Sequence, residues 1–82
     1  MYHVYLERHD TNKNMHRFYQ LFVVRGLLGD WSLVREWGRV GSSGQVRKDW
    51  FDSVEQAIAA GERLRKVKGK KGYLTLKNEL FF

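Results

Sequence analysis

The spacing of apolar residues changes once along the chain, and this change constrains the fold more than any other feature. From residue 2 to residue 51, apolar side chains alternate with polar ones or form short apolar runs, as in β-strands. From residue 53 to residue 68, Val, Ala, Ile, Gly and Leu recur at helical spacing, as in one amphipathic helix. An order of strands followed by a helix favours an α+β fold.

Four strands are expected before the helix, over residues 2–9, 17–25, 31–40 and 45–51. The connections between them are short and rich in Asn, Asp, Gly and Ser, so residues 17–51 are predicted to form an antiparallel meander. The strand at 17–25 is apolar on both faces and is therefore placed centrally. Residues 73–76 offer a fifth strand at one edge.

The helix has recognisable start and stop signals. The run Asp52-Ser53-Val54-Glu55 is a capping-box pattern in which Asp52 caps the first turn and Glu55 reaches back. Lys and Arg collect toward the end, where the helix dipole favours them, and Gly69 and Gly72 offer stops. The expected architecture is an antiparallel sheet of four to five strands with one helix packed on one face, leaving the other face open to a partner.

Length and composition restrict the class of protein. The 82 residues are expected to form one domain, 1–82, with a thin core. There is no cysteine, which excludes disulfides and thiolate metal sites. The first residues show neither a signal peptide nor a long apolar span, so we expect a cytoplasmic protein without a membrane partner. The formal charge of +6 favours polyanionic partners, although it also fits a basic domain that is merely soluble.

Features required for catalysis are missing. The spacing of His3, His9 and His16 matches no zinc motif, and no serine stands in a nucleophile motif. The Gly-Ser loop at 41–44 joins two strands and lacks the Lys-Ser/Thr of a mononucleotide site. We therefore expect no enzyme activity, no metal, no cofactor and no small-molecule substrate.

The tripeptide Trp37-Gly38-Arg39 is the strongest functional signal. In a strand, Trp31, Arg35, Trp37 and Arg39 share one face, so a flat ring stands beside guanidinium groups. A sugar or base stacks on such a ring and a phosphate binds the guanidinium, which suits the end of a nucleic acid. A strand tryptophan is more often part of the core. The arginines on its face favour exposure, and Gly38 favours close approach of a helix or ligand to the opposite face.

Several blocks of the sequence resemble the WGR domain family, which is named for this tripeptide. They are Asn14-Met15-His16-Arg17-Phe18-Tyr19, Trp31-Ser32-Leu33-Val34-Arg35-Glu36-Trp37-Gly38-Arg39-Val40-Gly41, and Lys68-Gly69-Lys70-Lys71-Gly72-Tyr73. WGR domains occur in DNA-dependent poly(ADP-ribose) polymerases and in bacterial proteins, including some described as molybdate-metabolism regulators. The resemblance covers nearly all of residues 14–73.

The resemblance implies roles for individual residues. In the polymerases, similar domains bind DNA breaks, so Trp37 would lie against the sugar of the 5′-terminal nucleotide and Arg39 would hold a phosphate or a partner domain. Arg17 and Asn14 would contact the DNA backbone, whereas Tyr73 matches an aromatic residue with a structural role. No zinc finger or ADP-ribose transfer domain accompanies the motif in this sequence, so ADP-ribosylation is not expected of it.

The sequence thus predicts a non-enzymatic module that binds DNA ends or 5′-phosphates without reading base sequence. The expected contact residues are Trp37, Gly38, Arg39, Arg17, Asn14, Arg35, Lys70 and Lys71. The lysines at the helix end equally fit a solvated terminus that contacts nothing. The alternative function is a protein–protein interaction module that uses the same Trp/Arg face, because Trp, Tyr and Arg are common anchors of such interfaces.

Overall fold

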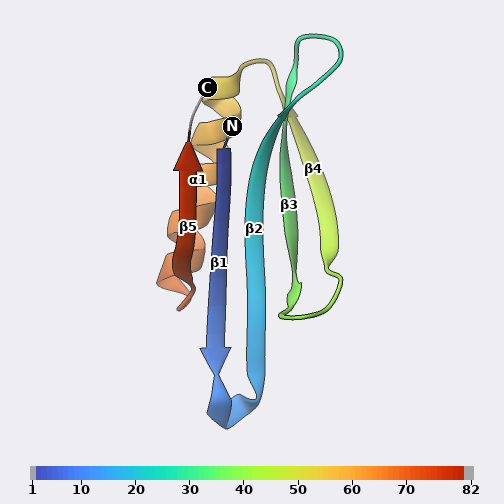
Figure 1. Cartoon of the computed structure of the whole chain (residues 1–82). Coiled ribbons are helices and arrows are strands. Elements are labelled where there is room, and N and C mark those ends of the chain that lie inside the picture. Colours follow the sequence, from blue (N-terminus) through green and yellow to red (C-terminus); the bar gives the residue numbers. More distant parts are fainter. Residues whose placement is uncertain (1, 81–82) are drawn as a thin grey trace.

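The computed structural model describes residues 2–80 and shows one antiparallel sheet with one α-helix across it (Figure 1). The elements are β1 (Tyr2–Asp10), a 3-10 turn η1 (Thr11–Lys13), β2 (Met15–Arg25), β3 (Trp31–Arg39), β4 (Gln45–Phe51), α1 (Val54–Lys70) and β5 (Leu74–Leu80). The strand order is β4-β3-β2-β1-β5, and every neighbouring pair is antiparallel. The α+β class, the meander and the central position of β2 are therefore confirmed.

The core lies between α1 and one face of the sheet. β1 contributes Tyr2, Val4 and Leu6, and β2 and β3 contribute Tyr19, Leu21, Val23 and Leu33, all of them buried. The helix faces these large side chains with Ala57, Ala60 and Gly61. A Cβ atom at Gly61 would lie 2.9 Å from the Tyr2 ring, so the glycine lets the helix pack closely on β1.

The face of β3 that carries the tryptophans is the face that α1 covers, which corrects the expectation that it is the open one. Tyr19 is paired with Trp37, and Leu21 is paired with Arg35, so Trp37 and Arg35 continue the core face of β2. Trp31 and Trp37 are partly buried and pack against the core. Alternation assigns residues to two faces, but it does not say which face the helix will cover.

The ring of Trp37 nevertheless keeps an accessible part, because the helix is shorter than the sheet. The 17 residues of α1 span about 25 Å at roughly 1.5 Å per residue, whereas the molecule is 46 Å long. Trp37 and Lys68, which lies near the end of α1, border the same pocket, so the tryptophan lies where the cover ends. It is half-buried rather than exposed or enclosed.

The helix begins at a different cap from the one expected. Ser53 is the N-cap, and its Oγ accepts a hydrogen bond of 3.1 Å from the Gln56 amide, so Asp52 does not cap the helix. The helix covers 54–70 rather than 53–68, and the edge strand covers 74–80 rather than 73–76. No helix in the described part of the chain has the length and apolar character needed to cross a membrane.

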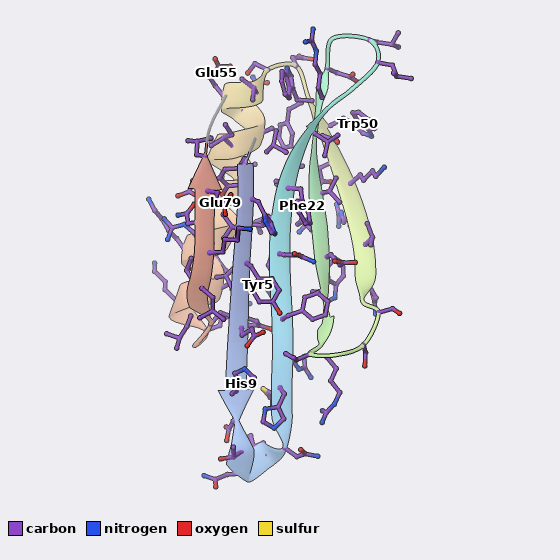
Figure 2. All side chains as sticks on the ribbon, viewed as in Figure 1. Tyr5, His9, Phe22, Trp50, Glu55 and Glu79 are labelled. Atoms are coloured by element: carbon purple, nitrogen blue, oxygen red, sulfur yellow. The ribbon has the colours of Figure 1, made fainter. Side chains whose placement is uncertain are left out.

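The open face of the sheet is lined by side chains that interact with one another. His3 stacks on Phe22 at 4.3 Å between ring centroids, and Tyr5 stacks on Phe18 at 6.2 Å. Gln20 hydrogen-bonds both His3 and Glu36. Figure 2 shows Tyr5, His9 and Phe22 on the neighbouring strands β1 and β2. This face already satisfies much of its own polar surface, which leaves the end of the sheet as the better candidate for a binding site.

Candidate nucleic-acid interface

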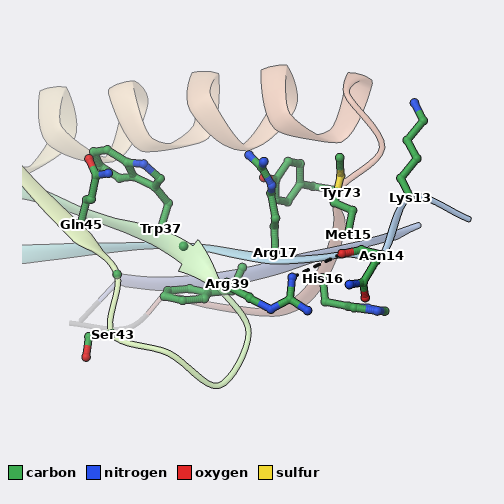
Figure 3. Close-up of a pocket in the computed structure, with 13 residues that line it drawn as sticks. Lys13, Asn14, Met15, His16, Arg17, Trp37, Arg39, Ser43, Gln45 and Tyr73 are labelled. Carbon is green, nitrogen blue, oxygen red and sulfur yellow. Dashed lines mark hydrogen bonds between the residues drawn. The ribbon is translucent and has the colours of Figure 1, made fainter. Parts of the chain in front are cut away.

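A pocket of about 570 Å³ lies where the start of β2 meets the end of β3 (Figure 3). Antiparallel register brings these ends together, because Arg17 is paired with Arg39, and Phe18 with Gly38. The Val40 amide donates a hydrogen bond of 2.9 Å to the His16 carbonyl and extends the pairing beyond β3. The motif and the Asn14–Arg17 segment therefore form one wall, although at least 20 positions separate them in sequence.

Trp37 is fixed by the core and also borders the pocket. Its ring centroid lies 6.2 Å from that of Tyr19, and the two ring planes differ by 26°. Such packing restricts the rotation of the indole before any ligand arrives. In Figure 3, Trp37 and Arg17 point from the sheet toward the helix. The tryptophan thus offers a pre-positioned, half-buried ring, rather than the exposed indole that the sequence predicted.

Gly38 is approached closely, as expected, but by the β3–β4 loop rather than by the helix or a ligand. A Cβ atom at Gly38 would lie 3.0 Å from the Gly44 Cα. A Cβ atom at Gly44 would in turn clash with the Trp37 carbonyl. The two glycines therefore let the loop fold over the end of β3, and this brings Ser43 and Gln45 to the pocket.

Arg39 is exposed and is held at the end of the sheet. Its Nη1 donates a hydrogen bond of 3.3 Å to the Asn14 carbonyl (Figure 3). Asn14 has a left-handed backbone, with φ of 49°, which asparagine tolerates better than most residues. This turn directs the carbonyl toward Arg39. A guanidinium has five N–H donors, so this one bond leaves capacity for an anion.

The pocket is strongly cationic. Lys13, Arg17 and Arg39 line it, and the described lining residues include neither Asp nor Glu. The ion pairs of the described chain involve other residues, on β1, β3–β4, α1 and β5. A pocket lined by cations and by no carboxylate has an electrostatic potential that favours anions.

The structure brings together five of the eight residues expected to contact DNA: Trp37, Gly38, Arg39, Arg17 and Asn14. Arg35 lies outside this pocket, where its Nη2 donates a hydrogen bond of 2.9 Å to Asp49. Arg35 and Lys71 line a second, smaller pocket on the helix side of the sheet. Lys70 is exposed and lines neither pocket.

Sequence reasoning missed other lining residues. Tyr73 was assigned a structural role, and it does pack edge-on against Tyr19, at 6.4 Å and 69°. It also lines the pocket, together with Lys13, Met15, His16, Phe18, Ser43, Gly44 and Gln45. Strand register could have identified His16 and Phe18, because they neighbour Arg17 opposite the motif. Nothing in the sequence placed Tyr73 beside them.

Beside the pocket, two histidines join a hydrogen-bonded chain. The Nδ1 atoms of His9 and His16 lie 2.7 Å apart, and His9 Nε2 lies 2.8 Å from Glu7 Oε1. The Tyr5 hydroxyl donates to the other Glu7 oxygen at 2.6 Å. This bond raises the pKa of Tyr5 to about 12 and is the main cause of the lowered pKa of Glu7. Within the described residues, no group of three His, Cys, Asp or Glu side chains could hold a metal ion.

Comparison with known proteins identifies a relative and a family for this chain. An uncharacterized protein, y4dW of Sinorhizobium fredii (strain NBRC 101917 / NGR234), is 39% identical over 72 residues. That match covers 88% of this chain and 35% of the relative, so the chain spans about a third of the relative's length. The WGR domain family matches residues 2–79. This range includes the helix and all five strands, apart from Leu80 at the end of β5. The chain therefore belongs to the WGR domain family.

Proposed function

We propose that this chain is a non-enzymatic nucleic-acid-binding module that holds the end of a DNA strand in the pocket beside Trp37. One observation carries the proposal: a half-buried indole and three cationic side chains border a single pocket whose described lining holds no carboxylate. The family assignment supports it, since WGR domains are associated with nucleic-acid binding in the poly(ADP-ribose) polymerases.

The proposed contacts follow from the geometry of the pocket. The sugar or base of a terminal nucleotide stacks on the accessible part of Trp37, a contact worth about 1–3 kcal/mol per base. Arg17 and Arg39 reach a 5′-phosphate or the adjoining phosphodiester with charge-assisted hydrogen bonds. Neither the ring nor the guanidinium groups read base edges, so binding tolerates any sequence.

The experiment compares two short duplexes that differ only in their 5′-phosphate. Their dissociation constants are measured by fluorescence anisotropy over a series of salt concentrations. We expect tighter binding of the phosphorylated duplex and a steep loss of affinity with salt. In a plot of the logarithm of the association constant against the logarithm of the salt concentration, each neutralised phosphate contributes about −0.9 to the slope.

Two variants and a control locate the contact. Arg17→Gln and Arg39→Gln remove one pocket cation each and should weaken binding and reduce the salt slope by about one phosphate. Arg63→Gln removes the same charge from an exposed helix position outside the pocket and should leave the preference for the 5′-phosphate unchanged. The proposal would be refuted if the protein bound both duplexes with equal affinity and if Arg17→Gln, Arg39→Gln and Arg63→Gln all changed that affinity to the same extent.

A protein partner would use the same residues, because Tyr, Trp and Arg dominate interface energetics. The two functions separate experimentally. Co-purification of a stoichiometric protein partner, lost in Arg39→Gln while DNA affinity stays unmeasurable, would assign the pocket to protein binding. DNA binding that is lost in the same variant assigns it to DNA.

A further inference from the structure

The second pocket lies on the helix side of the sheet and has a different composition. Its volume is about 250 Å³, below the roughly 300 Å³ at which drug-sized ligand sites begin. Three cationic residues line it: Arg35 from β3, Lys68 from the last turn of α1, and Lys71, the residue that follows α1. The described lining includes no Asp or Glu. Its size suits a small anion rather than an organic ligand.

Arg35 is only partly satisfied in this pocket. Its side chain is 18% exposed, and its Nη2 donates to Asp49. Its Nε is buried and has no hydrogen-bond acceptor within the described residues. A buried donor without an acceptor is costly, more so when the group is charged. Asp49 also pairs with Arg47, so Arg35 shares its carboxylate and keeps donor capacity that Asp49 does not use.

Lys68 adds an ammonium group that is also short of negative charge. Its Nζ lies 4.7 Å from the centroid of the Tyr19 ring and 5.5 Å from that of Tyr73. Burial lowers the pKa of Lys68, and the charges of Lys71, Arg35 and Arg17 lower it further. The two rings hold the ammonium by cation–π attraction, but they do not neutralise the repulsion among these cations. Binding an anion would relieve that repulsion.

We propose that the groove between α1 and β3 is a phosphate-binding subsite in which Arg35, Lys68 and Lys71 hold one phosphate group. Phosphate fits better than a carboxylate because its several oxygens and its charge can engage a guanidinium and two ammonium groups together. The phosphate belongs to a DNA strand or to a free phosphate compound, since both present the same group. Trp37 borders both pockets, so a strand end beside the indole could reach the groove as well.

This subsite does not depend on the proposed DNA-end function, and the test keeps the two apart. Protein carrying 13C-labelled lysine is titrated with pH in the absence and presence of inorganic phosphate, of pyrophosphate, and of a duplex with 5′-hydroxyl ends. The Nε–Hε signal of Arg35 is followed in the same samples. We expect phosphate to raise the pKa of Lys68 and to shift the Arg35 signal.

Matched variants then show whether the site is specific. Lys68→Met removes one ammonium, keeps the aliphatic stem, and should weaken binding about tenfold or more. Lys66→Met removes the same charge from an exposed position on α1 outside the pocket and should change affinity little. Arg39→Gln, which alters only the first pocket, should leave the response of Lys68 to inorganic phosphate intact.

Each outcome decides the proposal. A response to inorganic phosphate or pyrophosphate supports a subsite for free phosphate, and a response to the duplex alone supports a subsite for a DNA phosphodiester. The proposal is overturned if neither the Lys68 pKa nor the Arg35 signal changes with any of the three ligands. It is also overturned if Lys68→Met and Lys66→Met weaken binding equally, because general positive charge would then explain the effect.

Discussion

At the scale of single residues, Trp37 packs against the core and also keeps part of its ring accessible. Contact with Tyr19 fixes the ring, and part of the half-buried ring borders both pockets. A fully exposed indole would have to be ordered on binding, at a cost in conformational entropy. The half-buried ring is ordered in advance. Truncating Trp37 would therefore disturb folding as well as binding, which makes the pocket arginines cleaner probes.

Two glycines on α1 should respond to alanine in opposite directions. At Gly61 a Cβ would lie 2.9 Å from the Tyr2 ring, so Gly61→Ala should destabilise the fold by about 1–3 kcal/mol. At Gly69 nothing outside the neighbouring helix backbone lies within 4 Å of that position, so Gly69→Ala should stabilise the fold by about 0.4–1 kcal/mol. Urea denaturation checks both values. Stabilisation by Gly61→Ala would show that the helix does not pack on Tyr2 as described.

Glu62 should make the fold sensitive to acid. The Arg65 guanidinium, at 2.8 Å, is the main cause of its lowered pKa, and the Tyr2 hydroxyl, at 2.6 Å, adds to it. A lowered pKa in the folded state stabilises the fold above the ordinary pKa of about 4.5, and this stabilisation is lost as pH falls through the folded value. The stability difference between wild type and Glu62→Gln should therefore shrink from pH 7 to pH 3.

Urea denaturation at each pH measures that difference. Asp52→Asn is the control, because it makes the same change of carboxylate to amide at an exposed position just before the helix. A difference between wild type and Glu62→Gln that stays constant over the range would contradict the assigned contacts.

The residue chemistry of the site could largely be predicted from sequence, but the face it occupies could not. The tripeptide indicated a ring and a guanidinium at one end of a strand, and both border the same pocket. The charge on Arg35 favoured an open face. In the structure, Asp49 on β4 partly neutralises this arginine on the helix-covered face. The sequence does not show that Arg35 on β3 forms an ion pair with Asp49 on β4. The partial burial of the face that carries Trp37 and Arg35 could therefore not be predicted.

At the scale of elements, the helix start shows how boundaries depend on one hydrogen bond. Asp52 and Ser53 are both good N-cap residues, and only the backbone decides which side chain reaches a free amide. Ser53 has an extended backbone, with φ of −136° and ψ of 155°, and accepts from Gln56. The length of the edge strand β5 was also underestimated. Its pairing with β1 shifts register between Tyr5 and Leu6, and such a shift interrupts the regular alternation from which a strand is predicted.

The cap assignment gives a direct prediction. Ser53→Ala should lower the free energy of unfolding by about 1 kcal/mol, because the Gln56 amide loses its acceptor. Asp52→Ala should cost less, since Asp52 is not the N-cap. Thermal and urea denaturation of the two variants measure the contrast. A larger loss in Asp52→Ala would assign the cap to the aspartate.

At the scale of the whole molecule, the helix is shorter than the molecule is long, and the proposed binding end lies where the helix cover stops. The molecule measures 46 × 22 × 18 Å, and α1 covers only part of its length (Figure 1). Both pockets contain Trp37 and lie toward the end of the helix. The pocket cations contribute to a chain that is basic overall, with a formal charge of +6. On the proposed function, the cations that attract a polyanion would include those that hold its end in the pocket.

The most direct test of this account is a backbone amide chemical-shift titration with a short 5′-phosphorylated duplex. We predict that the largest shifts fall at Asn14–Arg17, at Trp37–Arg39 and in the 41–45 loop, with small shifts on the open face around His3 and Phe22. Shifts centred on the open face, or no shifts at concentrations that saturate other DNA-end binders, would contradict the central claim that the Trp37 pocket receives the DNA end.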